Sequence, residues 1–173
     1  MPNTVLVIDM VNGFLEPGHN LYCGDDSRQI IPKIYELLDR ERTAGSEIFF
    51  ISDHHDRYDL EFEMFPIHCV KGTDEPNVIP ELVEFVSETN VIAKNRYSGF
   101  FNTELETRLL ARAPDKIIIC GVCTDICVMH TASDARNRDY KVEVPSDCVA
   151  SFDTNDHEWA LARLKTILGV TVL

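Results

Sequence analysis

The sequence predicts an α/β fold, a doubly wound three-layer sandwich in which helices cover both faces of a six-stranded, mainly parallel sheet. Short apolar runs rich in β-branched residues alternate along the chain with longer segments of helical periodicity. The runs are apolar at successive positions, which is typical of parallel strands buried on both faces. The 173 residues contain no internal repeat and no turn-rich stretch long enough to link domains, so we expect one domain over residues 1–173.

The expected elements follow from these patterns in chain order. The first strand, residues 5–8, is wholly apolar, and the helix that follows it, residues 27–43, places Ile30, Ile34 and Leu38 on one face. The strand at 48–51 is again wholly apolar. The remaining elements, assigned on the same grounds, are a helix at 77–87, a strand at 91–93, a helix at 102–112, a strand at 117–120, a helix at 124–138, a strand at 141–144, a helix at 154–168 and a strand at 170–172.

Charge and composition exclude several classes of partner. The chain has 16 Lys and Arg against 29 Asp and Glu, a formal net charge of -13, and no basic cluster. Nucleic acids and anionic membranes both need a basic face, so we expect neither as a partner. No apolar run reaches the roughly 18 residues needed to cross a bilayer, and the first four residues lack the basic start of a signal peptide. We therefore expect a cytoplasmic protein.

The sequence leaves the oligomeric state open. The apolar residues Ile126, Val128 and Met129 fit either the core or the interface of a homo-oligomer.

Reactive side chains follow four of the expected strands. Asp9 follows the first strand, Asp53 the second and Lys94 the third, and the fourth leads into residues 121–127 with Cys127 at their end. Parallel α/β sheets bind ligands at the carboxyl ends of their strands. We therefore expect a carboxylate, an amine and a thiol to meet at one edge of the sheet.

The thiol of Cys127 is the candidate nucleophile. It lies three residues past Thr124, a plausible N-cap, so we expect it in the first turn of a helix, where the helix dipole lowers a thiol pKa. Asp9 can take the thiol proton and Lys94 can stabilise the resulting charges. The backbone N–H groups around Cys123 and Cys127 could hold an oxyanion.

The other cysteines have plainer explanations. Six cysteines in a chain without a secretion signal indicate reduced thiols rather than a disulfide framework. Cys120, Cys148 and Cys23 are interpreted as small core residues. A rival hypothesis from another class is a redox or iron–sulfur protein that uses Cys120, Cys123 and Cys127. It is disfavoured because Cys120 falls inside a strand and Cys127 opens a helix, so their sulfurs need not converge.

Residues 53–68 hold three of the six histidines among several carboxylates. Two imidazoles and two carboxylates suit a divalent transition ion such as Zn, Mn or Fe. In an extended segment Asp53 and His55 point to the same side and His54 to the other. The alternative is a solvated acidic loop whose histidines cap turns. Three further carboxylates are assigned to the surface: Asp56, Asp59 and Glu63.

Three motifs in this order resemble the cysteine hydrolases of the isochorismatase-like superfamily, and among them the nicotinamidases, also called pyrazinamidases. They are residues 7–14 around Asp9, residues 93–100 around Lys94, and residues 121–128, which match Gly-x-x-Thr-Asp-x-Cys-Val. The resemblance implies a Rossmann-like sheet with Asp9 as general base, Lys94 as catalytic lysine and Cys127 as nucleophile. Cys123 stands where Ala is usual, and there the resemblance implies a cis peptide after Val122 that turns N–H groups towards the oxyanion.

The same resemblance implies a metal and an aromatic pocket. Asp53, His55 and His68 fall on three ligand positions, and Glu61 resembles the fourth ligand of some bacterial members, with Glu63 as its rival. The pocket residues implied are Phe14, Phe65 and Tyr97.

The function expected on these grounds is hydrolysis of nicotinamide to nicotinate and ammonia, a step of NAD salvage, through a thioester on Cys127. The metal would bind the pyridine nitrogen and polarise water. The first alternative is another amidase of the superfamily, acting on a carbamoyl or ureido compound without a functional metal. An isochorismatase-type ether hydrolysis is less favoured, because it does not need the cluster of histidines and carboxylates.

Overall fold

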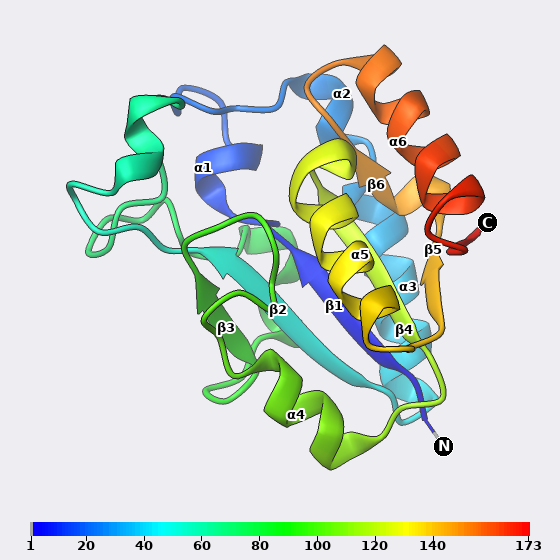
Figure 1. Ribbon diagram of the computed structural model, residues 1–173. Coiled ribbons are helices and arrows are strands. Elements are labelled where there is room, and N and C mark those ends of the chain that lie inside the picture. Colours follow the sequence, from blue (N-terminus) through cyan, green and yellow to red (C-terminus); the bar gives the residue numbers. More distant parts are fainter. Residues whose placement is uncertain (1) are drawn as a thin grey trace.

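The computed structural model describes residues 2–173, and its strands form one sheet (Figure 1). The strands are β1 (Thr4–Ile8), β2 (Glu47–Asp53), β3 (Val91–Lys94), β4 (Ile117–Val122), β5 (Val142–Val144), β6 (Val149–Ala150) and β7 (Thr171–Val172). The α-helices are α1 (Asn12–Leu15), α2 (Asp25–Arg28), α3 (Ile31–Thr43), α4 (Leu105–Arg112), α5 (Met129–Asn137) and α6 (Thr154–Thr166). None of the helices in the described part of the chain is long and apolar enough to cross a membrane.

The sheet confirms the predicted parallel topology. Its order is β3-β2-β1-β4-β5-β7, with β6 paired to β4, and every one of these strand pairs is parallel. The six predicted strands are all present, and the two-residue β6 is an addition. The strand order reverses at β1, which has β2 on one side and β4 on the other. A ligand crevice is expected at this reversal, beyond the carboxyl ends of β1 and β4.

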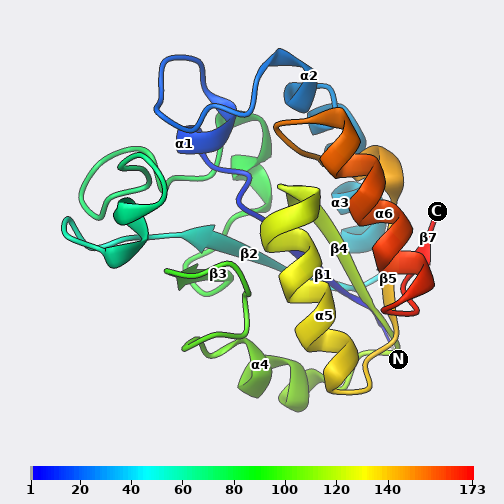
Figure 2. The same cartoon turned by 45° about the horizontal axis from the view of Figure 1, so that its top comes forward.

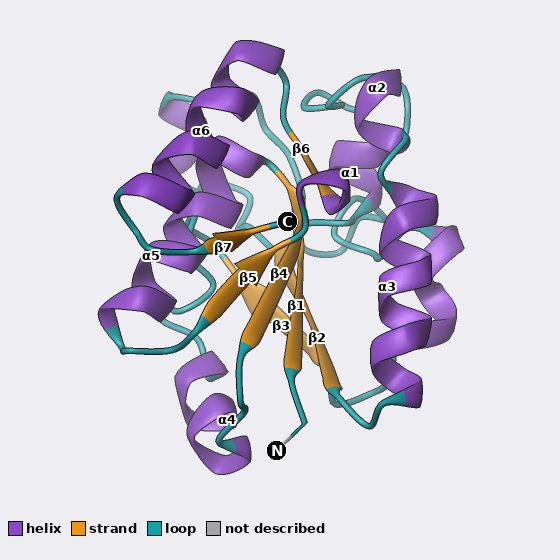
Figure 3. Cartoon of the chain, turned by 90° about the vertical axis from the view of Figure 1, so that its right-hand side faces the viewer, coloured by secondary structure: helices purple, strands orange, loops and turns teal. Residues whose placement is uncertain are grey.

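Helices cover both faces of the sheet, as predicted (Figure 3). Alternate residues of β1 face opposite layers. Val5 and Val7 pack with Ile34 and Leu38 of α3, whereas Leu6 and Ile8 belong to the core beneath α4, α5 and α6. Because each central strand contributes to two apolar cores, its sequence is apolar throughout.

Two predicted helices differ from the expectation in their limits or in their type. The helix expected at 27–43 is divided into α2 and α3, because Pro32 lies in the first turn of α3 and has no N–H to continue an earlier helix. The helix expected at 77–87 is a 3-10 helix, η2 (Pro80–Phe85). Its buried residues Leu82 and Phe85 are three apart, which suits a helix with three residues per turn.

The loops that follow β1, β2 and β3 gather at one end of the sheet, which Figure 2 turns towards the viewer. The longest of them, residues 54–90, joins β2 to β3 and contains two 3-10 helices, η1 (Leu60–Glu63) and η2. The chain after β4 forms a π-helical turn, η3 (Thr124–Val128), which runs directly into α5. The helix predicted at 124–138 is therefore continuous in outline but begins with this wider turn.

Candidate active site and metal site

The structure brings Asp9, Lys94 and Cys127 together in the interior. Asp9 directly follows β1, Lys94 ends β3, and Cys127 lies in η3 after β4. Lys94 Nζ is 2.9 Å from Asp9 Oδ2 and 3.5 Å from Cys127 Sγ. All three residues are buried, with exposed fractions of 1%, 3% and 6%. Asp9 has a φ of 51°, a left-handed conformation that Asp tolerates better than most residues and that turns its side chain out of the strand.

A second carboxylate completes this charge cluster. Asp53 ends β2 and pairs in register with Lys94, and its Oδ1 accepts a hydrogen bond from Lys94 Nζ. Burial lowers the pKa of Lys94, but Asp53 and Asp9 outweigh that effect and hold it well above its ordinary value. Burial and the Asp53 carboxylate raise the pKa of Asp9 to about 6. The centre is therefore a buried ammonium shared by two carboxylates, of which Asp9 is the more basic.

The sequence predicted a lowered pKa for the Cys127 thiol, and this prediction was wrong in direction, because the pKa is raised. Burial raises it well above its ordinary value, the carboxylates Asp9 and Asp53 raise it further, and Lys94 opposes them. Thr124 makes no capping hydrogen bond to the turn; its hydroxyl contacts His157 Nδ1 at 2.8 Å. The candidate nucleophile, Cys127, is thus a thiol that lies near a carboxylate with a raised pKa, Asp9.

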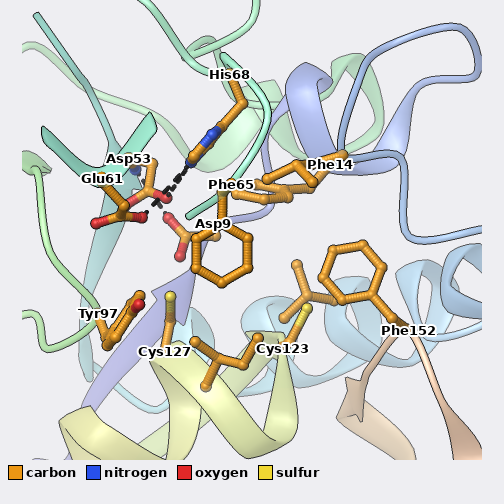
Figure 4. Close-up of a pocket in the computed structure, with 13 residues that line it drawn as sticks. Asp9, Phe14, Asp53, Glu61, Phe65, His68, Tyr97, Cys123, Cys127 and Phe152 are labelled. Carbon is orange, nitrogen blue, oxygen red and sulfur yellow. Dashed lines mark hydrogen bonds and ion pairs between the residues drawn. The ribbon is translucent and has the colours of Figure 1, made fainter. Parts of the chain in front are cut away.

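The backbone before the nucleophile has the unusual geometry that the resemblance implies. The Val122–Cys123 peptide is cis, and Cys123 immediately precedes η3. Cys123 and Cys127 both line the same pocket (Figure 4). Their N–H groups remain the predicted oxyanion donors.

The four side chains proposed as metal ligands also converge. Asp53, His55, Glu61 and His68 are buried, and one ligand atom from each lies within 4.8 Å of the others. Asp53 Oδ2 is 3.6 Å from Nε2 of both histidines, and Glu61 Oε1 is 4.0 Å from His55 Nε2 and 3.8 Å from His68 Nε2. Glu63, the rival of Glu61, is exposed. His54 and Asp56 also lie outside the cluster.

The hydrogen bonds of the two imidazoles fit a cation. His68 Nδ1 contacts the Pro66 carbonyl oxygen at 2.7 Å, and His55 Nδ1 contacts Asp59 Oδ2 at 3.1 Å. Each ring therefore directs Nε2 at the cluster, which is the usual orientation of a metal-binding histidine. His55 Nε2 and Glu61 Oε2 are buried without a hydrogen-bond partner among the described residues. A divalent ion bound at the cluster would satisfy these atoms.

An aromatic pocket connects the thiol to this cluster (Figure 4). The residues predicted to hold the substrate all line it: Phe14, Phe65 and Tyr97. The rings of Phe65 and Tyr97 pack edge to face, with 6.3 Å between their centroids. The empty volume, including its open mouth, is about 340 Å³. The wall also contains residues that sequence reasoning missed: Leu21, Val122, Ile126 and Phe152. Phe152 belongs to the loop between β6 and α6, and no motif marks it.

Asp59 is the other residue whose position was not anticipated. The sequence assigns it to the surface, but its side chain is only 5% exposed. It precedes η1 and accepts a hydrogen bond from the Glu61 N–H. An Asp at the start of a helical turn is an N-cap signal, and this signal could have identified it.

The three clustered cysteines do not form a common site. Cys120 and Cys123 belong to the core on one face of the sheet, and Cys127 belongs to the core on the other. Cys123 instead contacts Cys23, with sulfurs 3.7 Å apart. Within residues 2–173, no group of converging metal-binding side chains unites the three sulfurs of an iron–sulfur site.

The strand ends of this parallel α/β sheet carry a buried thiol, a carboxylate and an ammonium group. These are the groups that a hydrolase with a cysteine nucleophile uses. Comparison with known proteins agrees. The chain belongs to the isochorismatase family, whose domain matches residues 3–173.

Solved structures of this family superpose closely on the chain. A pyrazinamidase/nicotinamidase from Streptococcus mutans UA159 is 34% identical, with a TM-score of 0.93 and 99% of each chain covered. An N-carbamoylsarcosine amidase from Thermoplasma acidophilum is 30% identical, with a TM-score of 0.86, over 99% of this chain and 95% of that one. A pyrazinamidase of Pyrococcus horikoshii, solved in complex with zinc, is 28% identical, with a TM-score of 0.91, over 100% of this chain and 99% of that one.

Proposed function

We propose that this hydrolase is a nicotinamidase, which converts nicotinamide to nicotinate and ammonia. The observation that carries the proposal is that Asp53 joins two sites. Its Oδ1 contacts Lys94 beside Cys127, and its Oδ2 lies 3.6 Å from both histidines of the metal cluster. A small aromatic amide can therefore reach the thiol with one end and the metal cluster with the other.

The pocket suits a flat heteroaromatic ring. Phe14, Phe65 and Tyr97 surround the space between Cys127 and the histidines, and an apolar slot with few polar groups is the usual form of a small-ligand site. Asp53, His55, Glu61 and His68 would hold a divalent ion such as Zn, Mn or Fe. When bound, that ion supplies a Lewis acid for a ring nitrogen or for water.

The remaining chemistry belongs to the side chains of the chain. Asp9 takes the proton of Cys127 as the sulfur attacks the amide carbon, and the N–H groups of Cys123 and Cys127 stabilise the tetrahedral oxyanion. Asp9 then donates the proton to the leaving ammonia. With its carboxylate restored, Asp9 takes a proton from the water that attacks the thioester. It returns this proton to the Cys127 sulfur as the C–S bond breaks and the acid product leaves, which restores the thiol and the carboxylate. Lys94 remains charged throughout and offsets the negative charge of both carboxylates.

Ammonia release from nicotinamide by the purified protein tests this proposal. The assay is run on the protein as purified, after chelation, and after readdition of Zn, Mn or Fe, with Cys127→Ala as the blank. We expect release that depends on both metal and Cys127. Turnover by Cys127→Ala at the wild-type rate would overturn the mechanism.

The second candidate is an amidase for a carbamoyl compound, favoured by the similarity to the N-carbamoylsarcosine amidase. The same ammonia assay with N-carbamoylsarcosine and a ureido acid distinguishes the two. Release from these compounds without a metal, and none from nicotinamide, would replace the proposed substrate and retain the cysteine hydrolase.

A further inference from the structure

The side chain of Asp59 is buried, although it follows an exposed stretch of the loop between β2 and β3. Residues 56–58 are all exposed, whereas the Asp59 side chain is 5% exposed and lies behind the metal cluster. Its two carboxylate oxygens have three partners on three segments. Oδ2 accepts from His55 Nδ1 at 3.1 Å, and Oδ1 accepts from the Glu61 N–H at 2.9 Å and from Arg96 Nη1 at 2.9 Å.

Two of these contacts orient members of the metal cluster. The bond to Asp59 keeps the proton of neutral His55 on Nδ1, so the lone pair of Nε2 points at Asp53 and Glu61. The bond to the Glu61 N–H caps η1, the turn that aims the Glu61 side chain at the same point. His68 has a weaker support of this kind, because its Nδ1 meets a neutral backbone carbonyl at Pro66.

The third contact anchors Asp59 to the catalytic side of the site. Arg96 lies two residues after Lys94, and its guanidinium also lies 3.9 Å from Glu61 Oε2. The guanidinium of Arg96 offsets the negative charge of Asp59 next to Glu61. The loop that carries His55 and Glu61 is thereby tied to the strand end that carries Lys94.

We propose that Asp59 is the positioning residue that sets the affinity of the metal site, by orienting His55 and Glu61 together. This inference rests on the metal site of the proposed function and not on the identity of the substrate. Hydrogen-bond partners behind a metal ligand typically change metal affinity by about 10- to 100-fold when they are removed.

The test measures zinc affinity in the absence of substrate. Metal-free wild type, Asp59→Asn and Asp56→Asn are titrated with zinc in competition with a chromogenic chelator. Asp56 is a matched control, because it lies in the same loop, its side chain is 73% exposed, and it pairs with the exposed Lys71 away from the metal cluster. We expect zinc to bind Asp59→Asn about 10- to 100-fold more weakly than wild type, and Asp56→Asn with unchanged affinity.

Thermal unfolding of the metal-free proteins separates positioning from general destabilisation. An affinity loss in Asp59→Asn at an unchanged unfolding temperature supports the proposal, and equal zinc affinity in the two Asn variants overturns it. If Asp59→Asn does not fold, the test uses Arg96→Gln, because the Arg96 side chain is 37% exposed and its replacement should be tolerated. A loss of zinc affinity smaller than 10- to 100-fold supports the proposal. An unchanged zinc affinity overturns it. A wild type that binds zinc but does not hydrolyse nicotinamide overturns only the substrate, whereas a wild type that binds no zinc overturns this inference.

Discussion

Burial decides the protonation of the groups around the nucleophile. The side chains of Lys94, Asp9 and Asp53 are 0%, 1% and 5% exposed, so water screens their charges little. Buried charges are tolerated only when they are paired, and here one ammonium serves two carboxylates. Burial is the main cause that raises the pKa of the Cys127 thiol and that raises the pKa of Asp9 to about 6, and the neighbouring carboxylates raise both further.

Phe152 offers a residue-scale test of the pocket. Phe152 lines the pocket and is 45% exposed as a residue in the absence of a ligand, so truncation of its side chain should remove apolar contact with a bound aromatic ring. We expect Phe152→Ala to raise the KM for nicotinamide about five- to tenfold, or about 1–1.4 kcal/mol, with little change in kcat. Steady-state kinetics provide the measurement.

Phe101→Ala is the control for this variant. Phe101 is 50% exposed and does not line the pocket, so its removal should leave KM unchanged. Equal KM values for the two variants would mean that Phe152 does not contact the substrate.

At the scale of the element, the close contact of β1 with β4 places Asp9 beside η3, the turn that carries Cys127. Gly121 pairs with Ile8 in the parallel ladder and has a φ of 114°. A Cβ at this position would lie 2.0 Å from the Ile8 carbonyl oxygen. Any side chain at residue 121 must therefore push the end of β1 away from β4.

Gly121→Ala is expected to destabilise the fold by at least about 2 kcal/mol, from the strained φ and the backbone clash together. Urea unfolding at neutral pH measures the loss. Gly45→Ala is the comparison, because Gly45 also has a positive φ but has open space around it. A loss no larger than that of Gly45→Ala would show that the clash is relieved without moving β1.

A second element-scale prediction concerns the end of α3. Glu41 is buried there and accepts hydrogen bonds from Ser46 Oγ at 2.7 Å and Asn3 Nδ2 at 3.1 Å, which tie α3 to the starts of β2 and β1. Burial raises the pKa of Glu41, but these two bonds and Arg40 outweigh it and hold the pKa below its ordinary value. A lowered pKa in the folded state means that the ionised form stabilises the fold.

Glu41→Gln should therefore cost about 1 kcal/mol of unfolding free energy at pH 7. The difference from wild type should shrink as the pH falls below the ordinary glutamate pKa of about 4.3, through the lowered value of the folded state. Urea unfolding at pH 7 and at successively lower pH checks this, with exposed Glu36→Gln on the same helix as control. A difference that is independent of pH would contradict the assigned role.

At the scale of the whole molecule, the metal cluster joins β2 to the long loop between β2 and β3. Asp53 ends β2, whereas His55, Glu61 and His68 lie in the loop, and two of the buried atoms, His55 Nε2 and Glu61 Oε2, have no hydrogen-bond partner among residues 2–173. A bound divalent ion should therefore stabilise the folded chain as well as serve catalysis, by RT ln(1 + [L]/Kd).

Thermal unfolding with and without zinc measures this effect. At a free zinc concentration of about 100 times Kd, the expected stabilisation is about 2.7 kcal/mol. The double variant His55→Ala and His68→Ala should show no zinc-dependent rise in unfolding temperature. An equal rise in that variant would place the bound zinc elsewhere.

Much of this architecture could be predicted from local patterns. Apolar runs such as residues 48–51 indicated buried parallel strands, and parallel strands bring their carboxyl ends to one edge of the sheet. That rule was sufficient to predict that Asp9, Lys94 and Cys127 would meet. The motifs around these residues indicated the family, to which the chain belongs. The 3-10 form of η2 was not predicted, because helical periodicity does not separate short 3-10 from α-helical turns.

The sequence by itself therefore determined which reactive residue follows which strand along the chain. It also determined the set of residues from which a site could be built. Only the tertiary structure decided the direction of the Cys127 pKa shift, the convergence of Glu61 rather than Glu63 with the histidines, the burial of the Asp59 side chain and the place of Phe152 in the pocket wall. The physical reason is that spacing along the chain controls local direction, whereas desolvation and charge pairing depend on neighbours from distant segments. Arg96 beside Asp59, and Phe152 in the same wall as Phe14, are contacts of that second kind.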